Sequence, residues 1–444
     1  MKLIVEPATR TLTGTVTIPG DKSIGHRSLL FSLLSATPVR VVGLGDGADN
    51  GRSAKAITAL GASIAKDGDG LVITGTGLDG LVPPTSRIDC GNSGTTIRLL
   101  CGLLAGQRFA TTLFGDESLS KRPMRRVIEP LARMGATITG QGSGLDVTPP
   151  LVVGPADGPL KPLDYTLPMA SAQVKTAILL AGLFADGDTS VTEPGPSRDH
   201  SERMLAYLGA PLAVEGRRTT IATRGWNRRL ACDGFTVPAD PSSAAFLVAA
   251  AILVGGEVRL PGVCINPTRT GFLDAITAMG GHVAIVDPRA AGPETVADLV
   301  ISGAPQRLHG ITIGGDLAVR SIDELPILAV LAARAHGTTV VRDAEELRVK
   351  ESDRVETTCA MLRAFGVTCE AREDGFVVEG RPEGPLSAAR VHADGDHRIA
   401  MAAAVAGLVA DGQTVIDDAD NVATSYPGFA AALAALGAVV GATA

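Results

Sequence analysis

Aromatic residues make up only 3% of this 444-residue sequence, and its formal net charge of −7 leaves no excess of cations. Few aromatic side chains argue against an aromatic-rich binding surface, so the interior has to be built from Ala, Val, Leu and Ile in tight helix–sheet layers. A net negative charge argues against general binding to nucleic acid or to an anionic membrane surface. We therefore expect neither partner and look for a small-molecule ligand.

Metal-ligand spacing is also missing, because the six cysteines are scattered along the chain. We expect buried or neutral thiols and no metal site. Residues 1–18 alternate like a strand rather than resembling a secretion signal, and apolar runs such as 399–409 are too short to span a bilayer. These features predict a protein of a reducing compartment, the cytoplasm.

A two-part pattern occurs six times, at a spacing of about seventy residues. The first part is an apolar, small-residue helix followed by a short β-type run, at 27–42, 95–114, 173–192, 242–260, 324–342 and 398–416. The second part is an amphipathic helix that closes on Gly61, Gly135, Gly209, Gly280, Gly366 or Gly437, followed by one or two strands. Helices that are apolar almost all round should be buried, so the first-part helices should form the core.

The chain is too long for a single hydrophobic core, and the six repeats divide naturally into two α/β domains of three. We expect one domain at 20–237 and the other at 1–19 and 238–444. The sixth repeat stops short, so an N-terminal hairpin of Leu3–Pro7 and Gly14–Ile18 is expected to complete it. The two crossings then form a two-stranded hinge.

Polar motifs occupy the same position in every repeat, at the start of the apolar helix. They are Asp21-Lys22-Ser23, Asn92-Ser93-Gly94, Ser171-Ala172-Gln173, Asp240-Pro241-Ser242, Asp323-Glu324 and Asp396-His397-Arg398. Helix N-termini bind anions through free N–H groups and the helix dipole, so an anion site is one interpretation. Ordinary helix capping is the other, and a non-catalytic anion-binding repeat protein would show the same motifs.

Two further segments are rich in charge. Residues 120–126 hold four cations, and Glu346, Lys350 and Arg354 are spaced to lie on one face of a helix. Either segment alone would be read as solvated surface. Four of the eight lysines nevertheless lie in these polar motifs, which favours a local anion site in an otherwise acidic protein.

Taken together, these motifs resemble the enolpyruvyl transferase superfamily, and within it the 5-enolpyruvylshikimate-3-phosphate (EPSP) synthases. The resemblance covers essentially the whole chain. It implies two inside-out α/β barrel domains, each of three βαβαββ repeats, which close on the substrates. It also implies transfer of the enolpyruvyl group of phosphoenolpyruvate to the 5-hydroxyl of shikimate 3-phosphate, in aromatic amino acid biosynthesis, by a monomer without metal or cofactor.

The resemblance also implies site residues. Lys22, Asp323 and Glu351 would be catalytic, with Asp323 as the base near the 5-hydroxyl and Glu351 as the acid/base at C3, unless the two exchange duties between the half-reactions. Shikimate 3-phosphate would contact Lys22, Ser23, Arg27, Ser171, Ala172, Gln173, Arg198, Asp323 and Lys350. Phosphoenolpyruvate would contact Lys22, Gly94, Arg122, Gln173, Arg354 and Arg398.

Three departures from related patterns bear on this interpretation. The better-studied branch of the family places a Lys where this chain has Thr424, so one cation for phosphoenolpyruvate is missing or replaced. Other motifs resemble the glyphosate-tolerant class II branch, but Gly94 leaves room for that inhibitor, and we expect reduced or intermediate sensitivity. The loop 115–121 lacks the Cys usual in the UDP-N-acetylglucosamine enolpyruvyl transferases, which makes that activity the less favoured alternative.

Overall fold

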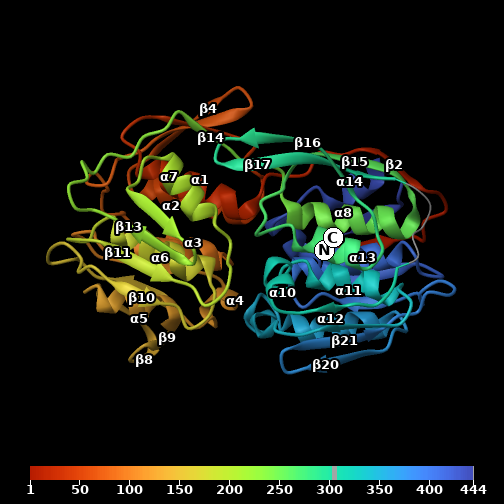
Figure 1. Cartoon of the computed structure of the whole chain (residues 1–444). Coiled ribbons are helices and arrows are strands. Elements are labelled where there is room, and N and C mark those ends of the chain that lie inside the picture. The colour runs from red at the N-terminus through yellow and green to blue at the C-terminus, as the bar shows by residue number, and fades with distance from the viewer. Residues whose placement is uncertain (303–307, 444) are drawn as a thin grey trace. The chain divides into compact units, whose positions relative to one another are not determined.

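The structure is a computed structural model that describes residues 1–302 and 308–443. The chain divides into two compact units (Figure 1). Unit 1 comprises Met1–Asp21, Pro238–Ala290 and Thr295–Ala444, and unit 2 comprises Lys22–Val237 and Ala291–Glu294. The chain therefore passes between the units beside the two predicted crossings, and the short segment 291–294 was not foreseen as part of unit 2.

Unit 2 contains three repeats in succession. The first has α1 (Lys22–Leu33), β3 (Val39–Val42), α2 (Ala48–Ala59), β4 (Ser63–Asp67) and β5 (Gly70–Thr74). The second has β6 (Ile88–Asp89), α3 (Gly94–Leu104), β7 (Thr111–Phe114), α4 (Glu117–Ser120), α5 (Arg125–Arg133), β8 (Ile138–Ser143) and β9 (Asp146–Val153). The third has β10 (Asp164–Thr166), α6 (Ala172–Gly182), β11 (Thr189–Thr192), α7 (His200–Tyr207), β12 (Leu212–Glu215) and β13 (Arg218–Ile221), and β14 (Gly234–Thr236) follows.

Each repeat of unit 2 forms one four-stranded sheet of the same design. The strand orders are β14-β3-β5-β4, β6-β7-β9-β8 and β10-β11-β13-β12, and in each the first pair is parallel and the other pairs are antiparallel. The first repeat has no strand of its own before its helix. β14, from the end of the unit's main segment, takes that place beside β3 and closes the ring of sheets.

Unit 1 repeats this design. It contains the fourth, fifth and sixth repeats of the chain. The fourth repeat has α8 (Pro241–Val254), β15 (Gly256–Cys264), α9 (Gly271–Ala278), β16 (Ala284–Ala291) and β17 (Glu294–Ile301). The fifth has β18 (Thr312–Ile313), α10 (Asp316–Arg320), α11 (Leu325–Ala333), β19 (Thr338–Val341), the 3₁₀ helix η1 (Glu345–Val349), α12 (Arg354–Ala364), β20 (Cys369–Arg372) and β21 (Gly375–Glu379). The sixth has β22 (Arg390–His392), α13 (His397–Gly407), β23 (Thr414–Asp417), η2 (Asp420–Thr424), α14 (Phe429–Ala435) and β24 (Val440–Thr443).

The predicted N-terminal hairpin is wrong, because its two strands enter different sheets. β1 (Lys2–Val5) lies antiparallel between β23 and β24 and completes the sixth repeat. β2 (Leu12–Thr15) runs parallel to β15 and supplies the first strand of the fourth repeat. Alternation of apolar residues predicts a strand but not its partner, and here the vacant edges of two separate sheets provide the partners.

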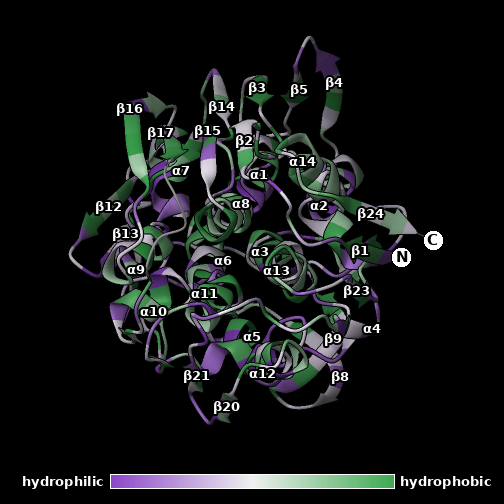
Figure 2. Cartoon of the chain, turned by 90° about the vertical axis from the view of Figure 1, so that its right-hand side faces the viewer, coloured by the Kyte–Doolittle hydropathy of each residue, from purple (hydrophilic) through white to green (hydrophobic). Residues whose placement is uncertain are grey.

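The first-part helices form the core of each unit, as their composition predicts. Every residue of α11 and of α13 is buried, and in α8 only the last two residues of the helix are not. Figure 2 shows α8 and α13 end-on as largely hydrophobic ribbons. With helices inside and sheets outside, the helix N-termini are left to carry the polar motifs. Within the described residues, no helix has the length and apolar character needed to cross a membrane.

Candidate active site

The starts of the three core helices of unit 2 are joined by side-chain hydrogen bonds. Gln173 at the start of α6 accepts from Arg98 Nη1 at 2.8 Å and donates to Thr95 Oγ1 at 2.9 Å, both on α3. Arg27 of α1 donates through Nη2 to Thr176 Oγ1 of α6 at 3.2 Å. The polar motifs of three successive repeats therefore meet at one end of the unit, where the helix dipoles favour an anion.

Arg27 organises the α1 side of this cluster. Its guanidinium is 2% exposed and donates to Ser201 Oγ at 2.7 Å and to the Ser23 carbonyl at 2.9 Å. Arg198 Nη1 donates to Ser23 Oγ at 3.3 Å, and Lys22 Nζ lies 3.1 Å from Asp49 Oδ2. The structure thus brings together Lys22, Ser23, Arg27 and Arg198, four of the residues for which the resemblance implies contact with shikimate 3-phosphate.

Arg122 reaches the start of α3 from the loop that follows α4. It donates to Asn92 Oδ1 at 2.8 Å, and its buried Nε has no hydrogen-bond partner among the described residues. A Cβ added at Gly94 would lie 3.1 Å from Arg122 Nη1 and 2.6 Å from Arg98 Nη1. Two guanidinium groups therefore converge on Gly94, the first residue of α3, which has no side chain.

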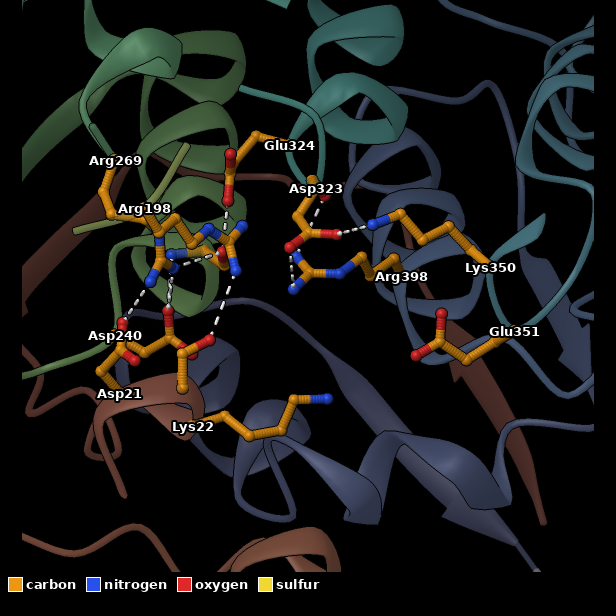
Figure 3. Close-up of polar contacts among 12 residues, drawn as sticks. Asp21, Lys22, Arg198, Asp240, Arg269, Asp323, Glu324, Lys350, Glu351 and Arg398 are labelled. Atoms are coloured by element: carbon orange, nitrogen blue, oxygen red, sulfur yellow. Dashed lines mark hydrogen bonds and ion pairs between the residues drawn. The ribbon is translucent and has the colours of Figure 1, made fainter. Parts of the chain in front are cut away.

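In unit 1, Asp323 stands immediately before α11 among three cations. Its carboxylate lies 3.2 Å from Arg354 Nη1, 3.7 Å from Arg398 Nη2 and 3.8 Å from Lys350 Nζ. Figure 3 shows Lys350 and Arg398 both directed at this carboxylate. Glu324, and not Asp323, occupies the N-cap position of α11, and Glu324 makes no side-chain capping bond. The expectation that Asp323 is the N-cap of this helix is therefore wrong.

Arg354 connects three carboxylates below the surface of unit 1. It is 1% exposed and donates to Asp396 at 2.8 Å, to Glu351 at 2.7 Å and to Asp323. Burial opposes its charge, but the three carboxylates outweigh burial and raise the pKa of Arg354 above its ordinary value. Burial likewise acts to raise the pKa of Asp396, and the Arg354 guanidinium nevertheless holds that pKa below its usual range.

The predicted single helical face through Glu346, Lys350 and Arg354 is wrong. The chain forms the 3₁₀ helix η1, becomes extended at Lys350, and enters α12 only at Arg354. Lys350 Nζ still reaches Glu346 at 2.8 Å, so the ion pair survives without the continuous helix. The break separates Lys350 and Glu351 from both helices and allows them to lie near Asp323 and Arg354, respectively.

Arg269 forms a second buried group of unit 1, at the point where the chain crosses. It is 2% exposed and donates to Asp21 at 2.6 Å, Asp240 at 3.1 Å and Ser242 at 2.9 Å (Figure 3). Ser242 in turn donates to Glu324, next to Asp323. Burial and then the neighbouring Asp21 raise the pKa of Asp240, against the effect of Arg269.

The predicted site residues thus fall into two clusters. The unit 2 cluster contains Lys22, Ser23, Arg27, Gly94, Arg122, Ser171, Ala172, Gln173 and Arg198. The unit 1 cluster contains Asp323, Lys350, Glu351, Arg354 and Arg398. Asp396 lies in one of the motifs and Arg269 in a segment that resembles the class II branch, but neither was given a role, and Arg98 and Asp49 were not singled out as site residues. Position 424 lies in η2, where the Thr424 hydroxyl donates to the Asn421 carbonyl.

This arrangement defines a class of protein. Helix starts bearing Arg and Lys suit small polyanionic substrates, and adjacent Asp and Glu suit proton transfer. Among residues 1–302 and 308–443, no group of three or more His, Cys, Asp or Glu could hold a metal ion. The site is that of an enzyme acting on anionic small molecules.

Comparison with known proteins identifies the family. A family model described as EPSP synthase (3-phosphoshikimate 1-carboxyvinyltransferase) matches residues 7–433. The 3-phosphoshikimate 1-carboxyvinyltransferase of Geobacter sulfurreducens is 49% identical over 96% of both chains, and that of Desulforamulus reducens is 49% identical over 97% of this chain and 98% of its own. A solved EPSP synthase from Acinetobacter baumannii superposes with a TM-score of 0.87 at 41% identity, covering 99% of each chain.

The chain belongs to the EPSP synthase family, the enzymes of the enolpyruvyl transfer step in the shikimate pathway to aromatic amino acids. The resemblance drawn from the motifs is confirmed, and so is the predicted fold of inside-out α/β domains.

Proposed function

We propose that this chain transfers the enolpyruvyl group of phosphoenolpyruvate to the 5-hydroxyl of shikimate 3-phosphate and releases inorganic phosphate. The observation that carries the proposal is Asp323, a carboxylate 8% exposed that lies among Arg354, Arg398 and Lys350. Glu351 is bound to the same Arg354. Groups for proton transfer and groups for anion binding are thus found in one cluster.

Binding falls mainly to the cations, because the two substrates are anions that repel each other. A helix N-terminus contributes roughly 0.3–1 kcal/mol to binding an anion. Hydrogen bonds to charged groups contribute about 1.5–3 kcal/mol each, so several Arg and Lys contacts supply most of the affinity. We assign phosphoenolpyruvate to Lys22, Gly94, Arg122, Gln173, Arg354 and Arg398, and shikimate 3-phosphate to Lys22, Ser23, Ser171, Ala172, Gln173, Arg198 and Lys350.

The assigned chemistry is an addition followed by an elimination. Asp323 accepts the proton of the 5-hydroxyl while the hydroxyl oxygen forms a bond to C2 of phosphoenolpyruvate. C3 of phosphoenolpyruvate takes up a proton, which Glu351 supplies in this assignment. The tetrahedral adduct then loses a proton from C3, the C2–O bond to phosphate breaks, and the double bond re-forms. The positive charge of Lys22 stabilises the negative charge of the departing phosphate. The two carboxylates could exchange duties between the steps.

The cations around Asp323 suggest how substrate prepares the base. Before substrate binds, Arg354 and Arg398 bind the carboxylate and compete with any other hydrogen-bond donor. The carboxylate and phosphate of phosphoenolpyruvate would draw these guanidinium groups toward themselves. Asp323 would then be able to accept the hydrogen bond of the acceptor hydroxyl.

Arg27 fits a positioning role better than the direct contact the resemblance implies. Its side chain is buried, and its hydrogen bonds to Ser23, Ser201 and Thr176 engage one N–H of each guanidinium nitrogen. It would therefore act by holding Ser23 in place.

We infer a monomeric, cytoplasmic enzyme. Each cluster is built from groups of one chain, which requires no second copy. The six free cysteines, five of them buried, are compatible with a reducing compartment.

The test is phosphate release from purified protein given phosphoenolpyruvate with shikimate 3-phosphate, with UDP-N-acetylglucosamine as the alternative acceptor. Release with shikimate 3-phosphate alone is expected. Release with the nucleotide sugar alone would move the chain to the other branch of the superfamily. Binding of both substrates without release would leave only a non-catalytic anion-binding protein.

A further inference from the structure

A buried ion group lies below the start of α6, beneath the residues assigned to shikimate 3-phosphate. Lys175 is in the first turns of α6, and its side chain is 2% exposed. Its Nζ lies 2.5 Å from Glu193 Oε2, just beyond β11, and 2.5 Å from Glu202 Oε1, in the first turn of α7. The side chains of Glu193 and Glu202 are 8% and 9% exposed. We call these three residues the buried trio.

The charges of the buried trio do not balance if both carboxyl groups are ionised. One ammonium faces two carboxylates, and within the described residues Glu193 Oε1 and Glu202 Oε2 have no hydrogen-bond partner. An unpaired buried charge is costly, so uptake of one proton is the cheaper state. Burial raises the pKa of Glu202 despite the nearby Lys175, and the charge of Glu193 adds to this effect. The direction of this pKa shift favours Glu202 as the carboxyl that takes up the proton.

The buried trio runs beside a second link between the same two helices. Thr176 Oγ1 and Ser201 Oγ are 2.5 Å apart and join the next residue of α6 to the residue before Glu202 on α7. Arg27 donates to both hydroxyl groups. The starts of α6 and α7 are thus fixed to each other at two adjacent points. One start carries Ser171–Gln173, and Arg198 lies two residues before the other.

We propose that Lys175, Glu193 and Glu202 form a buried trio that positions the starts of α6 and α7 for the phosphate of shikimate 3-phosphate. These are positioning residues, since each is buried and engaged within the trio. The proposal rests on the proposed function. It goes beyond that function by giving the acceptor subsite a support that phosphoenolpyruvate shares only through Gln173, because its other assigned contacts lie outside α6 and α7.

The first test is Lys175→Met, measured by steady-state phosphate release with each substrate varied in turn. Loss of Lys175 removes the cation that joins Glu193 and Glu202, and with it one of the two links between the helix starts. We expect the KM for shikimate 3-phosphate to rise about tenfold or more, because small misplacements of binding groups are costly, and the KM for phosphoenolpyruvate to change less than about threefold. Lys161→Met, at an exposed lysine of the same unit, is the matched control and should match the wild type.

The second test compares the two carboxyl groups. If the proton lies on Glu202, Glu202→Gln replaces a protonated carboxyl with an amide of similar shape, whereas Glu193→Gln removes the negative charge beside Lys175. Glu193→Gln should therefore raise the KM for shikimate 3-phosphate several times more than Glu202→Gln. This comparison tests the proposal even if the Lys175→Met variant fails to fold. Lys175→Arg should restore part of the affinity.

Two results would overturn the proposal: equal rises in both KM values, or equal effects of the two Glu→Gln variants. The wild type in the same assay separates this failure from failure of the proposed function. A wild type that releases no phosphate refutes the function, whereas an active wild type with unselective variants refutes only the buried trio.

Discussion

The two units hold the arginines described above in different ways. In unit 2, the hydrogen bonds described for Arg27, Arg98 and Arg122 go to hydroxyl, amide and carbonyl oxygens. In unit 1, Arg354 and Arg269 instead bind carboxylates, three and two respectively. When a guanidinium binds neutral groups, its positive charge is not compensated and can attract an anionic ligand. When it binds carboxylates, its charge is compensated and it holds those carboxylates in place. Unit 2 is thus built mainly to bind anions, and unit 1 to position acids and bases.

The largest effect is expected from Asp323→Asn, which tests whether unit 1 positions the base of the reaction. The amide keeps the shape but cannot accept the hydroxyl proton, so kcat should fall about a thousandfold or more. The dissociation constant for shikimate 3-phosphate, measured by calorimetry, should stay within about threefold. Asp316→Asn, at an exposed position, is the control. A kcat within tenfold of the wild type would remove Asp323 from the chemistry.

Asp396→Asn should mainly affect stability. The substitution removes the negative charge that Arg354 Nε binds, and this guanidinium is buried. Breaking a buried ion pair costs about 3 kcal/mol of the free energy of unfolding. Because the folded-state pKa of Asp396 lies below its unfolded value, its stabilisation is present at neutral pH and is lost as pH falls through the folded value. The wild-type advantage in urea unfolding should therefore shrink below about pH 4. The exposed-pair variant Asp417→Asn should lose far less, and an equal loss would contradict the prediction.

Arg122→Met tests the binding role of unit 2. Removing one charged donor should raise the KM for phosphoenolpyruvate about thirtyfold, in line with roughly 2 kcal/mol for a charged hydrogen bond, with a smaller change in kcat. Arg125→Met, three residues along and exposed, should leave both constants unchanged. A fall in kcat with unchanged KM would assign Arg122 to the chemistry instead.

Gly94→Ala is the mildest test. The new methyl would meet the ends of two flexible side chains, Arg98 and Arg122, so the protein should fold and the guanidinium groups should shift slightly. We expect the KM for phosphoenolpyruvate to rise about fivefold, since a shifted charged contact loses part of its roughly 1.5–3 kcal/mol. The inhibition constant of glyphosate should rise further. Gly158→Ala, in open space, is the control, and equal values in both variants would show that the methyl has no effect on the site.

Local features made much of this predictable. Helices apolar on all sides, glycines at helix ends and polar residues at helix starts are each written within a few residues, and they locate α1, α3, α6, α8, α11 and α13. The resemblance added the family and the residue roles, and it supplied Asp323 and Glu351, which spacing alone did not distinguish from capping or surface charge.

Partnerships over long distances were not predictable. Arg269 and Asp21 are 248 residues apart, and nothing near either residue shows that they pair. The strands β1 and β2 are adjacent in sequence yet enter different sheets, because the vacant edges lie elsewhere in the fold. The prediction that Glu346, Lys350 and Arg354 share one helical face assumes a continuous helix, and the chain is extended at Lys350.

The way each ring of sheets is closed has a consequence for biosynthesis. The sheets of unit 2 need strands from residues 22–237 only, whereas β1 must wait for β23 and β24, near the other end of the described chain. As the chain emerges from the ribosome, unit 2 can fold early while the apolar strand that holds Leu3 and Val5 is still unpaired. Completion of unit 1 is therefore the late step of synthesis, and the N-terminal strand is the segment that chaperones would have to protect until then.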